Sequence, residues 1–144
     1  MFVNKLVGAA FVCVLGFMSG CGGNSGPTLH KVSGIVTHKG QPLSNITIKF
    51  APVDGEVYSS ATPDEQGRFT LQYTMHQPGV VAGENVVYVE YRPSTPEEES
   101  ESAKPAFQPP APYKEVIAKY GTKAKSSYKV TIDDSQDNLQ VTLD

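Results

Sequence analysis

Histidines are the first residues to examine for chemistry, because imidazole binds metals and carries protons near neutral pH. The chain has three of them, His30, His38 and His76. His30 and His38 stand at opposite ends of one predicted strand, and at about 3.3 Å per residue they are too far apart to share a metal ion. Met75 and His76 have donor types that copper accepts, but no second group of ligands accompanies them. The sequence therefore predicts no metal site and no cofactor.

An acidic stretch near the end of the chain resembles a calcium-binding loop in its spacing. Asp133, Ser135 and Asp137 alternate, and Asp144 follows further along. A calcium loop of that kind lies between two helices, whereas residues 139–143 alternate as a strand. We therefore expect a polar turn over 133–138 and no calcium site.

Motifs for catalysis and for nucleic-acid binding are absent from the sequence. It contains no nucleophile elbow, zinc-protease helix, phosphate loop or dinucleotide-binding fingerprint. The net charge is −3, and lysines and arginines form no basic stripe of the kind that binds nucleic acid. We predict that the protein is not an enzyme and has no nucleic-acid partner.

The N-terminus has the pattern of an export signal. Lys5 precedes an apolar run over residues 6–18, which is shorter than the roughly 20 residues needed to span a bilayer. The tetrad Met18-Ser19-Gly20-Cys21 follows, and it resembles the lipobox of bacterial lipoproteins, with methionine where leucine is usual. An ordinary cleaved signal, or an uncleaved anchor with Cys21 in place by accident, is the alternative.

The lipobox resemblance implies a lipid anchor at the cell envelope. Residues 1–20 would be removed by cleavage between Gly20 and Cys21, and Cys21 would carry a thioether-linked diacylglycerol and an acylated amino group. Residues 21–28, rich in glycine and serine, would form a flexible tether. Gly22 is not the aspartate that retains lipoproteins in the inner membrane of enteric bacteria, which favours the outer membrane over the inner.

Residues 29–144 have the pattern of an all-β domain. Alternating apolar and polar residues predict seven short strands near 29–38, 45–50, 58–62, 68–74, 85–91, 128–133 and 139–144. Turn signals separate them, among them Asp64 to Gly67, where the aspartate suits the first position of a type I turn and the glycine the fourth. Short strands in this rhythm predict a seven-stranded antiparallel β-sandwich, immunoglobulin-like or prealbumin-like.

The segment 93–125 interrupts this rhythm with one long loop, rich in proline and glutamate. The acidic run Glu97 to Glu101 and the prolines after it predict disorder over 94–112. A short helix is predicted over 113–120, between Pro112 and Gly121. Its apolar residues share one face, which we expect to pack on the core; they are Tyr113, Val116, Ile117 and Tyr120.

Nearly all of residues 29–144 resembles carboxypeptidase regulatory-like, or transthyretin-like, domains, of the type carried by small planctomycete lipoproteins. Val32-x-Gly34-x-Val36, Gly40-x-Pro42-Leu43, Ile46-x-Ile48-x-Phe50, Asp64-x-x-Gly67-x-Phe69-x-Leu71, Gly83-x-x-x-Val87 and Ile117-Ala118-Lys119-Tyr120 carry the resemblance. Ala118 stands where those lipoproteins usually have proline. Some transthyretin-like proteins hydrolyse 5-hydroxyisourate with a C-terminal Tyr-Arg-Gly-Ser, whereas this chain ends Val-Thr-Leu-Asp. The resemblance implies a prealbumin-like sandwich without that activity.

Two non-catalytic functions agree with these features. The first is display of a structural or protein-binding module on a lipid anchor, with the 93–125 loop and exposed strand edges as contact surfaces. The second is a module that binds a carbohydrate or cell-wall polymer, for which several of the seven tyrosines would have to share an exposed, coplanar face. The sequence names neither the ligand nor the partner, and it leaves the oligomeric state open.

Overall fold

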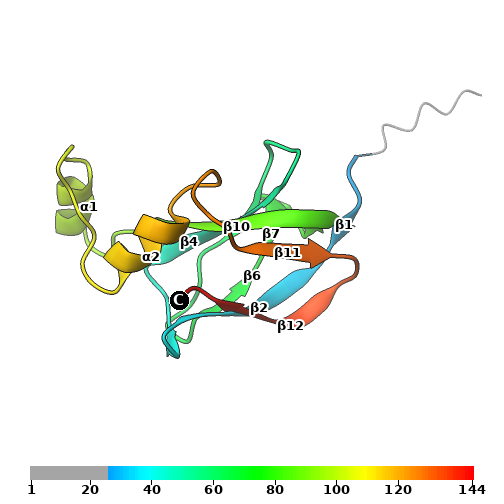
Figure 1. Ribbon diagram of the computed structural model, residues 1–144, viewed down its shortest axis with the longest axis horizontal. Coiled ribbons are helices and arrows are strands. Elements are labelled where there is room, and N and C mark those ends of the chain that lie inside the picture. The colour runs from blue at the N-terminus through cyan, green and yellow to red at the C-terminus, as the bar shows by residue number, and fades with distance from the viewer. Residues whose placement is uncertain (1–25) are drawn as a thin grey trace, which may run out of the picture.

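The computed structural model describes residues 26–144. Gly20, Cys21, the predicted signal over 1–20 and most of the predicted tether lie outside the described residues. Within the described part the chain is built mainly of β-strands with two short helices, which confirms the all-β prediction. Neither helix is long and apolar enough to cross a membrane. Two sheets lie face to face, and both helices lie towards one end of the molecule (Figure 1).

The larger sheet has six antiparallel strands in the order β11-β10-β4-β5-β7-β8. Its centre is the long pairing of β4 with β10, in which Ile48 lies opposite Val89 and Phe50 opposite Val87. The strands are β4 (Ile46–Pro52), β5 (Ser59–Ala61), β7 (Gln72–Thr74), β8 (Gln77–Pro78), β10 (Gly83–Tyr91) and β11 (Lys129–Ile132). A separate pair joins β1 (Leu29–His30) to β9 (Val80–Val81).

The smaller sheet is built around β2 (Val32–His38). It also contains β3 (Gln41–Pro42), β6 (Arg68–Thr70) and β12 (Gln136–Thr142). Strands β3 and β6 pair with β2 antiparallel, but β12 pairs with it parallel. The prediction of antiparallel pairing throughout is therefore wrong for this pair. The reason is that β11 belongs to the larger sheet, so the chain crosses between sheets after Ile132 and enters β12 alongside β2 instead of returning beside β11.

The single strand predicted over 68–74 is two strands in different sheets. β6 pairs with β2 in the smaller sheet, and β7 pairs with β5 in the larger one. The crossing point is Leu71, whose side chain is fully buried and whose N–H donates to the Val32 carbonyl at 2.9 Å. The alternation continues through the crossing because both Phe69 and Leu71 enter the same core. Apolar alternation therefore did not reveal the change of sheet.

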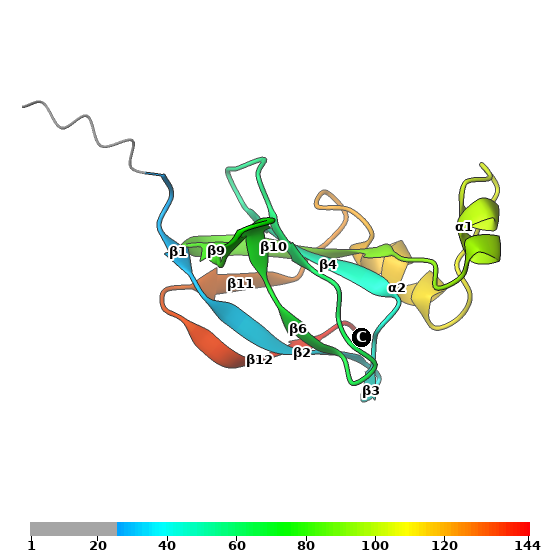
Figure 2. The same ribbon diagram turned by 180° about the vertical axis from the view of Figure 1, so that it is seen from behind.

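The hydrophobic core lies between the two sheets (Figure 2). From β2 it takes Val32 and Val36, which are 1% and 0% exposed, and from β4 it takes Ile48 and Phe50, both 0% exposed. Burying side chains of this size stabilises the fold by roughly 1.5–3 kcal/mol each. The turn predicted at Asp64 to Gly67 is confirmed, because the Gly67 N–H donates to the Asp64 carbonyl at 2.9 Å.

The helix predicted over 113–120 is confirmed as α2 (Tyr113–Tyr120). Val116 is buried in the core, and Tyr113, Ile117 and Tyr120 pack partly buried against it, as their shared helical face predicted. The helix ends before Gly121, whose N–H donates to the Ile117 carbonyl.

The segment expected to be disordered, 94–112, contains the helix α1 (Pro96–Ser102). Thr95 caps its first turn by accepting from the Glu98 N–H, and proline occupies the first helical position. The glutamates of the first turn lie at the positive end of the helix dipole. The acidic residues that indicated disorder therefore also favour a helix start here. None of the residues of α1 is buried.

Candidate functional site

The residues flagged as possible metal ligands are not brought together. His30 lies in β1, His76 lies exposed in the β7–β8 turn, and His38 is buried at the end of β2. Among residues 26–144, no group of three or more His, Cys, Asp and Glu side chains is placed to hold a metal ion. The turn expected over 133–138 is shorter than predicted, because β12 begins at Gln136. Ser135 in this turn accepts a hydrogen bond from the Lys31 N–H.

The tyrosines do not form one coplanar platform. Six of the seven stand in three pairs, Tyr58–Tyr88, Tyr91–Tyr113 and Tyr120–Tyr128. The rings of these pairs are inclined by 76°, 53° and 82°, so none of the pairs presents a flat double surface for a sugar ring. Most of the tyrosines therefore serve packing.

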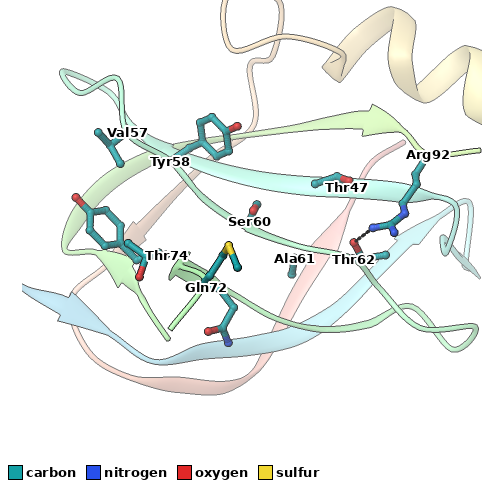
Figure 3. A pocket seen from close by; sticks show the side chains of 11 residues that line it. Thr47, Val57, Tyr58, Ser60, Ala61, Thr62, Gln72, Thr74 and Arg92 are labelled. Carbon is teal, nitrogen blue, oxygen red and sulfur yellow. Dashed lines mark hydrogen bonds between the residues drawn. The ribbon is translucent and has the colours of Figure 1, made fainter. Parts of the chain in front are cut away.

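A groove of about 640 Å³ lies over the outer face of β4, β5 and β7. Hydroxyl-bearing side chains gather in its lining, namely Thr47, Ser60, Thr62 and Thr74. Figure 3 shows Val57 and Tyr58 at one end of the groove and Arg92 at the other. Large apolar side chains stand exposed beside the hydroxyls, with Tyr58 at 41%, Val57 at 57% and Met75 at 90%. A surface of hydroxyls with exposed apolar edges suits a ligand that has both polar and apolar faces.

Arg92 is held in place at its end of the groove. Its Nη1 donates to the Thr62 hydroxyl at 2.8 Å, and its backbone N–H donates to the Asn45 carbonyl at 2.9 Å. A guanidinium has five donor hydrogens, so this side chain keeps further donors to offer a ligand.

Tyr58 packs against a largely buried cation on the outer face of the larger sheet. The Lys49 ammonium lies 4.5 Å from the centre of the Tyr58 ring and 5.7 Å from that of Tyr88, and it pairs with the Glu90 carboxylate at 2.5 Å. Burial opposes the charge on Lys49, but the hydrogen bond and charge of Glu90 outweigh it and raise the pKa of Lys49 above its ordinary value. Desolvation raises the pKa of the Tyr88 hydroxyl. The cation therefore persists at neutral pH and holds both rings by cation–π attraction.

A smaller cavity of about 410 Å³ lies between the end of β2 and the start of α2, and it includes the buried His38. Sequence reasoning considered His38 only as a metal ligand. The signal that it would be buried was nevertheless present, because His38 continues the inward-facing register of Val32, Gly34 and Val36.

Comparison with known proteins assigns the chain to no group. No family model matches it, no curated protein matches it, and no solved structure matches it.

Proposed function

We propose that this chain is a non-catalytic lipoprotein of the bacterial cell envelope, which displays a β-rich interaction module on a lipid anchor at Cys21. We further propose that its all-β fold is a prealbumin-like sandwich of the carboxypeptidase regulatory-like type found in planctomycete lipoproteins. The family-like motifs support that assignment by their positions, since Val32, Gly34 and Val36 lie on the buried face of β2.

The single observation that supports display is the arrangement of the module along its long axis. β1, the first strand after the tether, lies at one end, and α1 lies at the opposite end (Figures 1 and 2). An anchor before β1 would therefore present α1 and the segment 93–125 away from the bilayer. α1 has no buried residue and carries Glu97, Glu98 and Glu99 in its first turn, so its surface is acidic. A partner with a basic surface would be favoured at this end by charge complementarity.

The lipid anchor is tested by removing the sulfur. In Cys21→Ala, labelling with a radioactive fatty acid should be lost and the protein should leave the membrane fraction, because several acyl chains at about 0.8 kcal/mol per buried CH₂ supply the attachment. Cys13→Ala is the matched control and should behave as wild type, since Cys13 lies within the segment that cleavage removes. Membrane retention and labelling of Cys21→Ala would refute the anchor.

A second candidate function is binding of a carbohydrate or cell-wall polymer in the groove of Figure 3. The observation in its favour is the combination of four hydroxyl side chains with the exposed ring of Tyr58 and the guanidinium of Arg92. Arg92→Ala and Tyr58→Ala should then each reduce retention on purified cell-wall polysaccharide, whereas Lys114→Ala on α2 should not. A glycan array without hits at high protein concentration would count against this function.

A further inference from the structure

His38 is a buried histidine whose two ring nitrogens have different surroundings. The residue is 5% exposed, and Nδ1 lies 2.5 Å from the carbonyl oxygen of Leu143. A carbonyl oxygen only accepts, so Nδ1 must carry the proton. In the neutral ring Nε2 is then a bare acceptor, and it has no hydrogen-bond partner among the described residues.

A carboxylate oxygen, which is another acceptor, lies close to Nε2. The Glu115 Oε2 atom of α2 lies 3.6 Å from it. The Lys39 ammonium holds that carboxylate at 2.5 Å, and its hydrogen bond and charge lower the pKa of Glu115. In the neutral ring, the Nε2 lone pair therefore faces the Glu115 carboxylate at 3.6 Å. A donor from outside that reaches both atoms would satisfy both.

The cavity beside these two acceptors has apolar walls. Leu43, Ala111 and Pro112 line it together with Lys39, His38 and Glu115. Its volume of about 410 Å³ accommodates a short aliphatic chain. The Lys39 and Glu115 side chains are 64% and 60% exposed, so both can rotate without disturbing the core. An alkyl chain ending in an ammonium has the matching chemistry, and Lys39 already shows that Glu115 accepts such a group.

We propose that this cavity, the His38–Glu115 pocket, binds a lysine side chain of a partner protein, with the ammonium donating to Glu115 Oε2 and His38 Nε2 and the aliphatic stem against Leu43 and Pro112. This inference rests on the proposed display function. It names the group that binds in a pocket which the displayed 93–125 segment helps to form. Lys39 is the internal competitor for the same carboxylate. The charged groups that face the ring are Glu115 from α2, Asp144 after β12, at 3.9 Å from Nδ1, and Lys39 beside β2.

The test is a peptide titration of the full chain purified in detergent, followed by NMR at His38 and Glu115. The probe is acetyl-Gly-Lys-Gly-amide, and the matched control replaces lysine with norleucine, which has the stem without the charge. We expect saturable shifts with the lysine peptide alone, at roughly millimolar affinity because few atoms make contact.

Variants of the two charged residues separate this pocket from general charge attraction. Glu115→Gln should weaken the lysine peptide about tenfold, because charge-assisted hydrogen bonds are the stronger kind. Lys39→Met should strengthen it by removing the competitor, and Glu97→Gln on α1 should leave it unchanged. Equal binding of the norleucine peptide, or wild-type affinity in Glu115→Gln, would overturn the proposal. Such a failure would leave the lipid anchor intact, because Cys21→Ala tests that separately.

Discussion

Gly34 and Leu139 approach each other so closely that a side chain on the glycine has no room. A Cβ built on Gly34 would lie 2.0 Å from the Leu139 carbonyl oxygen. The two residues are register partners in the parallel pairing of β2 with β12. This contact explains physically why glycine stands between Val32 and Val36. It also ties the last strand of the chain to the first long one.

Gly34→Ala is therefore expected to displace β12 from β2. The loss of unfolding free energy should be about 1–3 kcal/mol, the range of overpacked sites that relax by backbone movement. Gly26→Ala is the matched control, because nothing lies within 4 Å of a Cβ there. Chemical denaturation measures both. Equal stability of the two variants would show that β12 can move away from β2 with little loss of unfolding free energy.

The ion pair of Lys49 and Glu90 predicts unequal effects of removing either partner. The Lys49 side chain is 10% exposed and that of Glu90 is 55% exposed. Glu90→Ala leaves the ammonium buried with an unmet charge and should cost about 1–3 kcal/mol. Lys49→Met removes the buried charge itself and should stay within about 1 kcal/mol of wild type.

Glu84→Ala, on the same strand, is the control for this comparison. The Glu84 and Lys129 side chains are each about half-exposed, so losing this ion pair should lower the free energy of unfolding by at most about 1 kcal/mol. Thermal unfolding of the three variants ranks their stabilities. If Lys49→Met proved the most destabilising, packing of its stem would outweigh its charge.

Acid should weaken the fold through Asp64 and Glu115. The backbone N–H of Arg68 donates to Asp64 and lowers the pKa of that carboxyl. The Lys39 ammonium donates to Glu115 and lowers the pKa of that carboxyl. A carboxyl with a lowered pKa binds fewer protons in the folded state than in the unfolded one, so its contribution is complete above about pH 5. It is lost as the pH falls below about 4 through the folded pKa. Urea unfolding between pH 3 and pH 7 should therefore show a smaller pH slope for the Asp64→Asn, Glu115→Gln double variant than for wild type. Identical slopes would contradict the assignment.

Sequence pattern predicted the strands well and their partners poorly. The alternation of Ile46, Ile48 and Phe50 marks which residues face the core, because side chains in a strand alternate between its two faces. It carries no information on which strand lies beside which. The parallel entry of β12 and the split at Leu71 both result from chain crossings between sheets. Such crossings leave the apolar period unchanged.

The two candidate sites were less predictable than the fold. The groove combines Thr47, Tyr58 and Arg92, which come from three separate parts of the chain. His38 and Glu115 are likewise 77 positions apart in sequence and meet because α2 packs beside the end of β2. What could be inferred locally was the burial of each residue, as with Val116 on the inner face of α2.

The α1 end of the molecule should be the first point of proteolysis. A seven-residue helix is marginal in water, and α1 buries none of its residues. The Glu98 carboxylate accepts from the Ser94 N–H and from the Tyr91 hydroxyl, and Phe107 after the helix stacks on Tyr91 at 5.7 Å. A glutamate-specific protease should therefore cut within 94–112, at Glu97 to Glu101, before it cuts Glu84 or Glu90 in β10.

Mass spectrometry of a time course identifies the first cut, and circular dichroism shows whether the strands survive it. We expect the β-signal to persist after cleavage, because the core residues come from segments on both sides of α1 and stay packed together. Uniform resistance would mean that 94–112 is held more firmly than these contacts indicate. Simultaneous cleavage in β10 would mean that opening is global, and the distal end would then have no special mobility with which to receive a partner.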